Sequence, residues 1–206
     1  TSEAFHGTIG EFTIYDRQLS DSEILEYHNS KVIMNSWDNK RLCAHYKVGE
    51  DGIFKDQLSD ISRVKGVYDK VNGDVNDFCI STPNSFQEDS RVFCLGENIS
   101  EISYSFWFNP KNLRTDDSSI LLSTSVSSYL RILFNTSGTV NARYRLDNSN
   151  NWNSGMVSTS HPILDLNKWH HITVTLSNNT VSLFINGKFI NKEVFPAGFS
   201  SIIQGV

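Results

Sequence analysis

The sequence predicts an all-β protein, an antiparallel two-sheet sandwich with one short helix. Short alternations of apolar and polar residues recur along the 206 residues, as in 101–108 (EISYSFWF) and 168–176 (KWHHITVTL). Polar, turn-forming stretches separate these alternations, which is typical of many short strands. The composition can also supply a core, because 13 Phe, 7 Tyr and 4 Trp are present among 38% apolar residues.

The first elements are expected to be a strand and a capped helix. In a strand at 8–15, Ile9 and Tyr15 fall on one side and Phe12 and Ile14 on the other. A helix is expected over 21–28, because the preceding serine at position 20 is followed three residues later by a glutamate, which forms a capping box.

The later elements are expected to be strands. Within 101–108, Phe106 and Phe108 share one face and Trp107 lies on the opposite face. Asn186-Gly187 between two apolar runs predicts a hairpin with a type I′ turn. Other strands are expected at 41–48, 77–81, 90–95, 118–124, 129–135, 139–146 and 180–186, with a loop containing one brief strand at 49–75.

Charge and hydropathy exclude two classes of partner. The net charge is −5 and the sequence pI is about 5.6, whereas an electrostatic nucleic-acid binder would be basic. No run of about 18 apolar residues exists, so no membrane insertion is expected. The sequence begins without methionine, which predicts a processed product or a segment of a longer protein.

Two blocks of sequence resemble the concanavalin A-like lectin/glucanase superfamily, and within it the laminin-G-like and pentraxin-like jelly rolls. One block holds the W-H-H-I run and the I-N-G-K hairpin, with matching residues Trp169, His170, Ile172, Asn186, Gly187 and Lys188. The other resembles the closing strand and helix of the family, with matching residues Gly7, Ile9, Phe12, Ile14, Tyr15, Asp16, Arg17, Leu19, Ser20, Glu23 and Ile24. The resemblance implies an antiparallel jelly-roll sandwich.

The order of these blocks is rotated relative to the family, because the closing strand and helix come first. We expect residues 1–30 to complete a jelly roll, 31–40 to form a linker, and 41–206 to form a laminin-G-like jelly roll. Three explanations fit: one period of a tandem array, a circular permutant, or a strand that fills a gap in a neighbouring molecule. Each pairs a strand that would otherwise leave an open sheet edge. A repeat or assembly of adjacent copies is favoured, because arrays are common for this fold.

The cysteines and sequons predict an extracellular setting. An odd count of three cysteines leaves at least one thiol without a partner in the chain. Cys79 and Cys94 flank a turn-rich segment, so either a disulfide joins them or both are buried thiols. N-x-S/T sequons at Asn98, Asn135 and Asn178 fit N-glycosylation of a secreted or surface protein.

No catalytic residue is predicted. Glycosidases of the superfamily place two carboxylates on one face of a strand, where residues two apart lie side by side. The acidic pairs of this chain are adjacent and so point apart, in turns. His170 and His171 are also adjacent, so they cannot hold a metal together, and His171 is expected to be a hydrogen-bonded core residue.

The candidate ligand sites are a loop and a strand face. The resemblance implies calcium as the candidate ion, held by oxygen ligands such as Asp147, Asn148 and Asp56. Four residues are predicted to bind a glycan, because they supply an aromatic surface and polar groups. These are Trp152, Asn151, Arg143 and Arg145. In the alternative interpretation, Trp152 packs under its own loop and the arginines are solvated.

Two functions follow from these observations. The first is a non-enzymatic extracellular structural or assembly module, such as a unit of a surface fibre, appendage or adhesin on a cell or virion. The second is a glycan-binding, lectin-like domain used in attachment. The rotated order and the odd cysteine favour the first, and the Trp152 loop favours the second.

Overall fold

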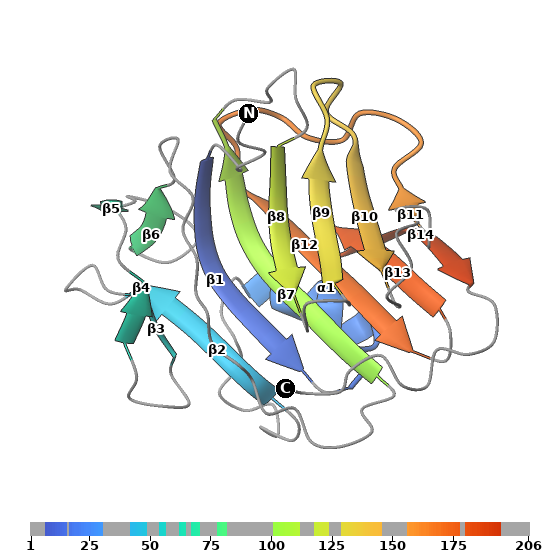
Figure 1. Ribbon diagram of the computed structural model, residues 1–206, viewed down its shortest axis with the longest axis horizontal. Coiled ribbons are helices and arrows are strands. Elements are labelled where there is room, and N and C mark those ends of the chain that lie inside the picture. The colour runs from blue at the N-terminus through green and yellow to red at the C-terminus, as the bar shows by residue number, and fades with distance from the viewer. Residues whose placement is uncertain are drawn as a thin grey trace.

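The computed structural model contains two antiparallel sheets packed face to face, with a helix outside them (Figure 1). It describes residues 7–15, 17–30, 42–48, 54–56, 62–64, 67–70, 78–81, 101–111, 118–123, 129–145, 156–177 and 180–194. The larger sheet has ten strands and the smaller has four. The predicted antiparallel two-sheet sandwich is therefore confirmed.

The strands of the large sheet come from both ends of the chain. They are β1 (Gly7–Tyr15), β2 (Leu42–Val48), β3 (Phe54–Asp56), β4 (Ser62–Val64), β5 (Val67–Lys70), β6 (Phe78–Ser81), β7 (Glu101–Pro110), β12 (His170–Ser177), β13 (Thr180–Ile185) and β14 (Lys188–Val194). The small sheet contains β8 (Ser118–Ser123), β9 (Tyr129–Phe134), β10 (Val140–Arg145) and β11 (Met156–Ser158). The helix is α1 (Asp21–Ser30).

Most element boundaries agree with the sequence, and two differences have a simple cause. The 49–75 segment contains three strands, β3 to β5, where one was expected, because runs of three or four residues are too short to show alternation. The three-residue strand β11 was not predicted for the same reason. The predicted strand at 90–95 and the linker at 31–40 lie outside the described residues.

Strand β1 lies in the middle of the large sheet, in the order β14-β13-β12-β7-β1-β2-β3-β4. One edge of β1 pairs with β7. The other edge pairs with β6 at Thr8 and Ile9, and with β2 from Phe12 to Tyr15. The predicted strand-pairing residues Ile9, Phe12, Ile14 and Tyr15 therefore pair within their own chain. The proposed division into domains stays a prediction.

A β-bulge corrects the predicted facing of β1. Ile9 pairs with Phe108 and Phe12 pairs with Phe106, so three steps along β1 match two steps along β7. The extra residue brings Ile9 to the same side of the sheet as Phe12 and Ile14. The prediction that Ile9 shares a side with Tyr15 is wrong, because simple alternation cannot reveal a bulge.

The main core lies between the two sheets. Phe108 of β7 packs on Phe134 of β9, with ring centroids 4.8 Å apart, and Phe106 packs on Phe12 at 5.7 Å. Fully buried aliphatic residues of both sheets surround these rings. They include Ile102, Ile132, Val140, Ala142, Ile172, Val174, Val181 and Leu183.

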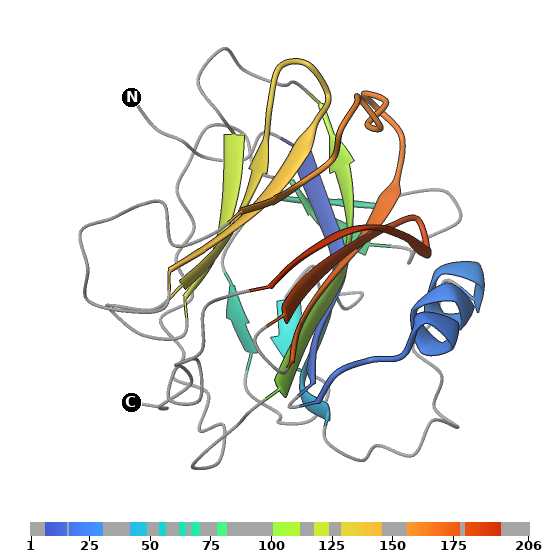
Figure 2. The ribbon, with the colours of Figure 1, turned by 90° about the vertical axis from the view of Figure 1, so that its right-hand side faces the viewer.

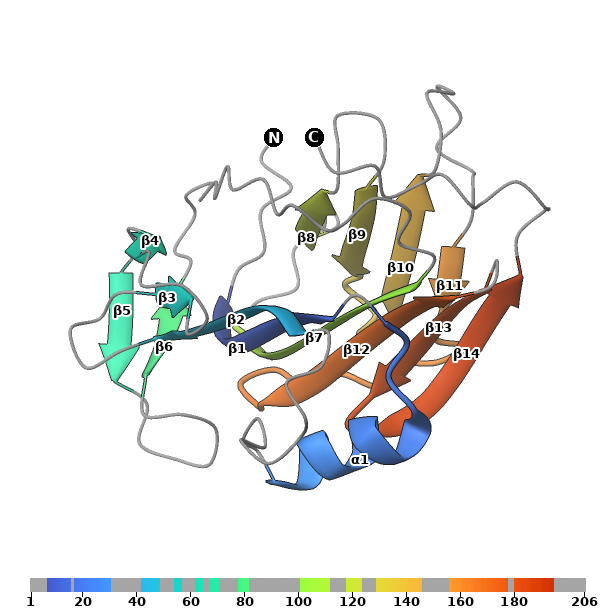
Figure 3. The same cartoon turned by 90° about the horizontal axis from the view of Figure 1, so that it is seen from below.

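The opposite face of the large sheet is covered by α1. Figure 2 shows the three layers in order, the small sheet, the large sheet and then α1. Seen from below, α1 lies against the part of the large sheet that contains β12 to β14 (Figure 3). This face carries many small hydroxyl residues, and Ser105 bonds Thr173 across β7 and β12 at 2.7 Å. Both residues are fully buried, although their alternation with apolar neighbours is typical of a solvated face.

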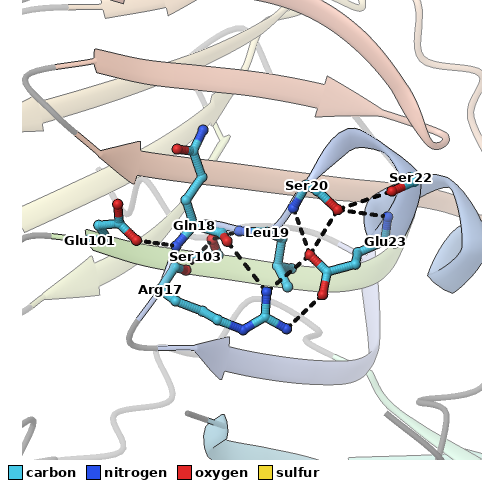
Figure 4. A network of polar contacts seen from close by, with 8 residues as sticks. All are labelled: Arg17, Gln18, Leu19, Ser20, Ser22, Glu23, Glu101 and Ser103. Atoms are coloured by element: carbon cyan, nitrogen blue, oxygen red, sulfur yellow. Dashed lines mark hydrogen bonds and ion pairs between the residues drawn. The ribbon is translucent and has the colours of Figure 1, made fainter. Parts of the chain in front are cut away.

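A polar network sets the start of α1 (Figure 4). The backbone N–H of Ser20 donates to Glu23 Oε2 at 2.7 Å, and the N–H of Glu23 donates to Ser20 Oγ at 3.3 Å, which confirms the capping box. Burial alone would raise the pKa of Glu23, but hydrogen bonds from Arg17 and Ser20 outweigh it and lower the pKa. The backbone N–H of Leu19 donates to Ser103 Oγ, which ties the helix start to β7.

Helix α1 ends at Ser30, two residues beyond the predicted end. Its inner side is anchored by a small apolar cluster. The members are Tyr15, Leu19, Ile24 and Phe184. Among the described residues, no helix is long and apolar enough to span a membrane.

Candidate functional site

The outer face of the small sheet contains a row of arginine positions. Arg143 in β10 pairs with Arg131 in β9 and with Met156 in β11. Arg145 lies two residues further along β10, so it occupies the same side of the strand. This side is opposite to Val140 and Ala142, which are buried in the core. The positions of Arg143 and Arg145 on one side of β10 therefore follow the expected alternation, and their role in a site stays a prediction.

Arg143 is held in place by its neighbour on β11. Its Nε lies 3.3 Å from Met156 Sδ, and the Met156 side chain is 40% exposed. A guanidinium on such a face presents a planar set of N–H donors, which suits hydroxyl, carboxylate and phosphate oxygens.

Polar groups extend the candidate site toward β11. Asn141 pairs with Ser158, and Asn191 of β14 donates from Nδ2 to the Ser158 carbonyl at 3.2 Å. The Ser158 hydroxyl is buried and has no hydrogen-bond partner in the part of the chain that the structure describes. Asn141 and the Ser158 hydroxyl are buried beside the arginine positions, whereas Asn191 is exposed.

The aromatic part of the predicted site falls in the connection between β10 and β11. Trp152 and Asn151 lie outside the described residues, as do Asp147 and Asn148. Strand β10 ends at Arg145 and β11 begins at Met156, so Trp152 lies between these two strands in the sequence.

The calcium prediction is not tested by the structure. Asp56 ends β3 and pairs with Tyr46 in the large sheet, whereas residues 147 and 148 follow a strand of the small sheet. The described residues contain no group of three or more His, Cys, Asp or Glu side chains that could hold a metal ion. Calcium binding and the lack of catalysis both stay predictions.

The predicted disulfide and glycosylation sites are only partly covered. Cys79 lies in β6, paired with Asp69 of β5, and Cys94 is outside the described residues. Asn135 lies in the turn between β9 and β10, where its Nδ2 donates to Thr139 Oγ1 at 2.8 Å. Asn98 and Asn178 are also outside the described residues.

The two adjacent histidines of β12 face opposite sides, as predicted. His170 packs against Phe108 between the sheets, and burial lowers its pKa. His171 is 1% exposed on the helix side, and its Nε2 lies 2.8 Å from Ser105 Oγ. His171 is therefore the hydrogen-bonded core histidine that its position in the strand predicts.

A group of aromatic and imidazole rings surrounds His171, and we call it the imidazole cluster. Its members are Tyr27, His28, Trp107 and His171. His28 stacks on Trp107 with ring centroids 5.3 Å apart, and on His171 at 5.8 Å. The Tyr27 ring meets His171 edge-on at 4.7 Å. No role for His28 was predicted from the sequence, although its place one residue after Tyr27 and four after Ile24 puts it near the inner face of α1.

The imidazole cluster is strongly desolvated. Burial, and secondly the charge of His28, lower the pKa of His171 to about 3. Burial, and then the charge of Glu11, raise the pKa of Tyr27. His171 is therefore neutral in the folded protein under ordinary conditions.

Two solved structures are similar to about half of this chain. The structure is similar to mouse laminin alpha1 chain domains LG4-5, with 14% identity and a TM-score of 0.34 over 50% of this chain and 25% of that chain. It is also similar to the carbohydrate binding module CBM66 from Bacillus subtilis, with 8% identity and a TM-score of 0.30 over 51% of this chain and 76% of that one. The chain thus spans a quarter of the matched laminin chain. No curated protein matches the sequence.

The family assignment rests on the sequence of the second half of the chain. A laminin-G model, described as the concanavalin A-like lectin/glucanases superfamily, matches residues 87–202, which is more than half of the 206 residues. This match covers β7 to β14, the strands that carry the sandwich core and the arginine row. The chain belongs to the concanavalin A-like lectin/glucanases superfamily.

Proposed function

We propose that this chain is a non-catalytic, lectin-like domain of an extracellular or surface protein, and that it binds glycans on the outer face of β9 to β11. The observation that carries the proposal is the row of arginine positions on that face, at Arg131, Arg143 and Arg145. Asn141 lies on the same side of β10, and Trp152 falls in the sequence between β10 and β11. Sugar sites need donors for hydroxyl oxygens and an aromatic surface for the ring, and these residue types supply both.

Replacing Arg143 with alanine is expected to weaken glycan binding about tenfold. A hydrogen bond to a charged group contributes about 1.5–3 kcal/mol, and each 1.4 kcal/mol is a factor of about ten in affinity. The measurement is a glycan array followed by titration of the strongest ligand. Trp152→Ala is expected to lower the affinity in the same assay, because it removes the aromatic surface.

The matched control is Lys192→Ala. It removes one positive charge from an exposed position on β14, in the other sheet. Its affinity should equal that of the unchanged protein. If the unchanged protein binds no glycan, or if Lys192→Ala weakens binding as much as Arg143→Ala, the proposed site is wrong.

The second candidate function is assembly of adjacent copies into a fibre or appendage. Strand β14 favours it, because β14 is an edge of the large sheet and carries the exposed side chains Phe189 and Val194. An exposed edge strand can add a strand from another molecule. Sedimentation of the chain over a range of concentrations tests this function, and a monomer at every concentration would contradict it.

A further inference from the structure

Helix α1 is the element that shields His171 from water. Among the described residues, two of the three rings that lie against His171 belong to α1, namely Tyr27 at 4.7 Å and His28 at 5.8 Å. The third, Trp107, belongs to β7 and lies 5.0 Å away. Departure of α1 would therefore open one side of His171 to solvent, and the strands on either side of β12 would stay in place.

The attachment of α1 is much smaller than that of the strands it covers. Within α1, only Ile24 and Tyr27 are buried, and Leu25 is half exposed. Among the described residues, α1 also contacts the sheet through the His28 ring on Trp107, through the capping network near Ser20 and at the hairpin turn of Gly187. By contrast, β12 is hydrogen-bonded along its length to both β7 and β13. Local opening with a low free energy is expected where buried apolar contacts are few.

We propose that acidic pH releases α1 from the large sheet while the sandwich stays folded, with protonation of His171 as the trigger. In the closed form an imidazolium at His171 would be buried, with the imidazole of His28 close by. In the open form it is hydrated and His28 has moved away. Release of α1 also exposes Ser105 of β7 and Thr173 of β12, two buried hydroxyl residues, to solvent.

The other titratable groups near His171 do not cancel this effect. In the part of the chain that the structure describes, Tyr27 and His28 of α1 contact His171, and Glu11 of β1 acts on Tyr27. The charge of Glu11 acts on the pKa of Tyr27, while desolvation and His28 set the pKa of His171. The described groups that contact His171 from β7 are Ser105 and Trp107, and Asn186 at the end of β13 accepts a hydrogen bond from the backbone N–H of His171; none of these three titrates near neutral pH.

The direction of the pH dependence follows from the difference in proton binding by His171 between the closed and open forms. The pKa of His171 is about 3 in the closed form, below the value of 6.5 for a free histidine, so the open form binds more protons between these limits. The equilibrium constant for opening is therefore constant above about pH 6.5 and rises up to about tenfold per unit as the pH falls below it. At about pH 5 the rise is about 30-fold.

Hydrogen exchange of the full chain, followed by mass spectrometry, tests this proposal. Exchange is measured at about pH 7.5 and about pH 5 and corrected for the pH dependence of free-peptide exchange. Protection of residues 21–30 should fall about 30-fold at the lower pH, while protection of β13 stays constant. Unchanged protection of α1, or an equal loss in β13, would overturn the proposal.

Two variants identify the trigger. His171→Gln keeps a polar group that can bond Ser105 but cannot gain a charge, so the response of α1 should shrink to less than about threefold. His28→Gln removes the neighbouring imidazole and keeps His171, so most of the response should remain. If His28→Gln abolishes the response, His171 is not the trigger. This comparison can be made even if His171→Gln does not fold.

Discussion

Replacing Ile14 with aspartate is expected to unfold the protein. Ile14 is 5% exposed in the central strand β1, where it pairs with Tyr104 of β7 and Ala44 of β2. A carboxylate at this position would be buried without a partner of opposite charge, which is among the most destabilising changes known for single residues. We expect a loss of about 4 kcal/mol or more, against a total stability of about 5–15 kcal/mol for an ordinary domain.

Val194→Asp is the matched control for this prediction. It introduces the same side chain in place of a β-branched aliphatic residue, but at a position that is 66% exposed on the edge strand β14. Its stability should stay within about 0.5 kcal/mol of the unchanged protein. Urea denaturation followed by circular dichroism measures both variants. Equal stabilities for Ile14→Asp and Val194→Asp would mean that β1 does not complete the sandwich.

The position of β1 bears on the rotated order of the chain. The sequence left three explanations open, and in the structure β1 pairs with β2, β6 and β7 of its own chain. This arrangement agrees with a domain whose closing strand precedes its other strands. Because β1 already fills its place in the large sheet, an assembly of copies would use another surface. The edge strand β14 is the candidate for that surface.

The fold was predictable because its strands follow simple periodic rules. Alternation placed Phe106 and Phe108 opposite Trp107, and the Asn186-Gly187 pair has positive φ angles of 52° and 74° as a type I′ turn requires. The bulge that turns Ile9 was not predictable, since it depends on the register with β7. Register is a property of two strands and does not appear in the pattern of either one.

The candidate site was predictable in part for similar reasons. The facing of Arg143 follows from its own strand, but Arg131 joins it only through the pairing of β9 with β10. The role of His28 depends on how α1 lies on the sheet, and nothing local to the helix specifies this. The burial of Ser105 and Thr173 could not be predicted from their strands either, because a polar face of a sheet becomes buried only when another element covers it.

Membership of the superfamily does not by itself decide between binding and catalysis. The name of the superfamily covers both lectins and glucanases, and one fold supports several unrelated activities. The arginine row therefore carries the functional proposal, since it is a property of this chain's own residues. Loss of binding in Arg143→Ala with normal stability would connect function to that face, independently of any likeness in fold.

Replacing Gly187 with alanine is expected to destabilise the protein by about 3 kcal/mol. The residue has φ +74°, and a left-handed conformation costs a non-glycine residue about 1–2 kcal/mol. An added Cβ would also lie 3.0 Å from the Cβ of His28 and 3.1 Å from Cδ1 of Leu25, so these neighbours on α1 would have to move by a few tenths of an ångström. Overpacking of this kind costs about a further 1–3 kcal/mol.

Substitutions of two other glycines separate the effect of backbone strain on stability from the effect of overpacking. Gly138→Ala meets the same strain at φ +79°, but the nearest atom, the carbonyl oxygen of Leu164, is 3.3 Å away, so we expect a loss of about 1–2 kcal/mol. Gly10→Ala has no positive φ and ordinary contacts of 3.4 Å with Trp107 and Trp169, so we expect a change below about 1 kcal/mol. Thermal denaturation of all three variants measures the order.

The part of the protein that Gly187→Ala destabilises shows whether backbone strain or overpacking is the cause. Backbone strain alone would weaken the hairpin of β13 and β14, whereas overpacking of the added Cβ against His28 would loosen α1 at neutral pH. We expect faster hydrogen exchange in residues 21–30 of this variant and unchanged exchange in the strand β7, because α1 rests on the turn but the sheet does not depend on it. If α1 keeps its full protection while the hairpin opens, the turn does not support the helix, and the contact between Gly187 and His28 contributes little to the docking of α1.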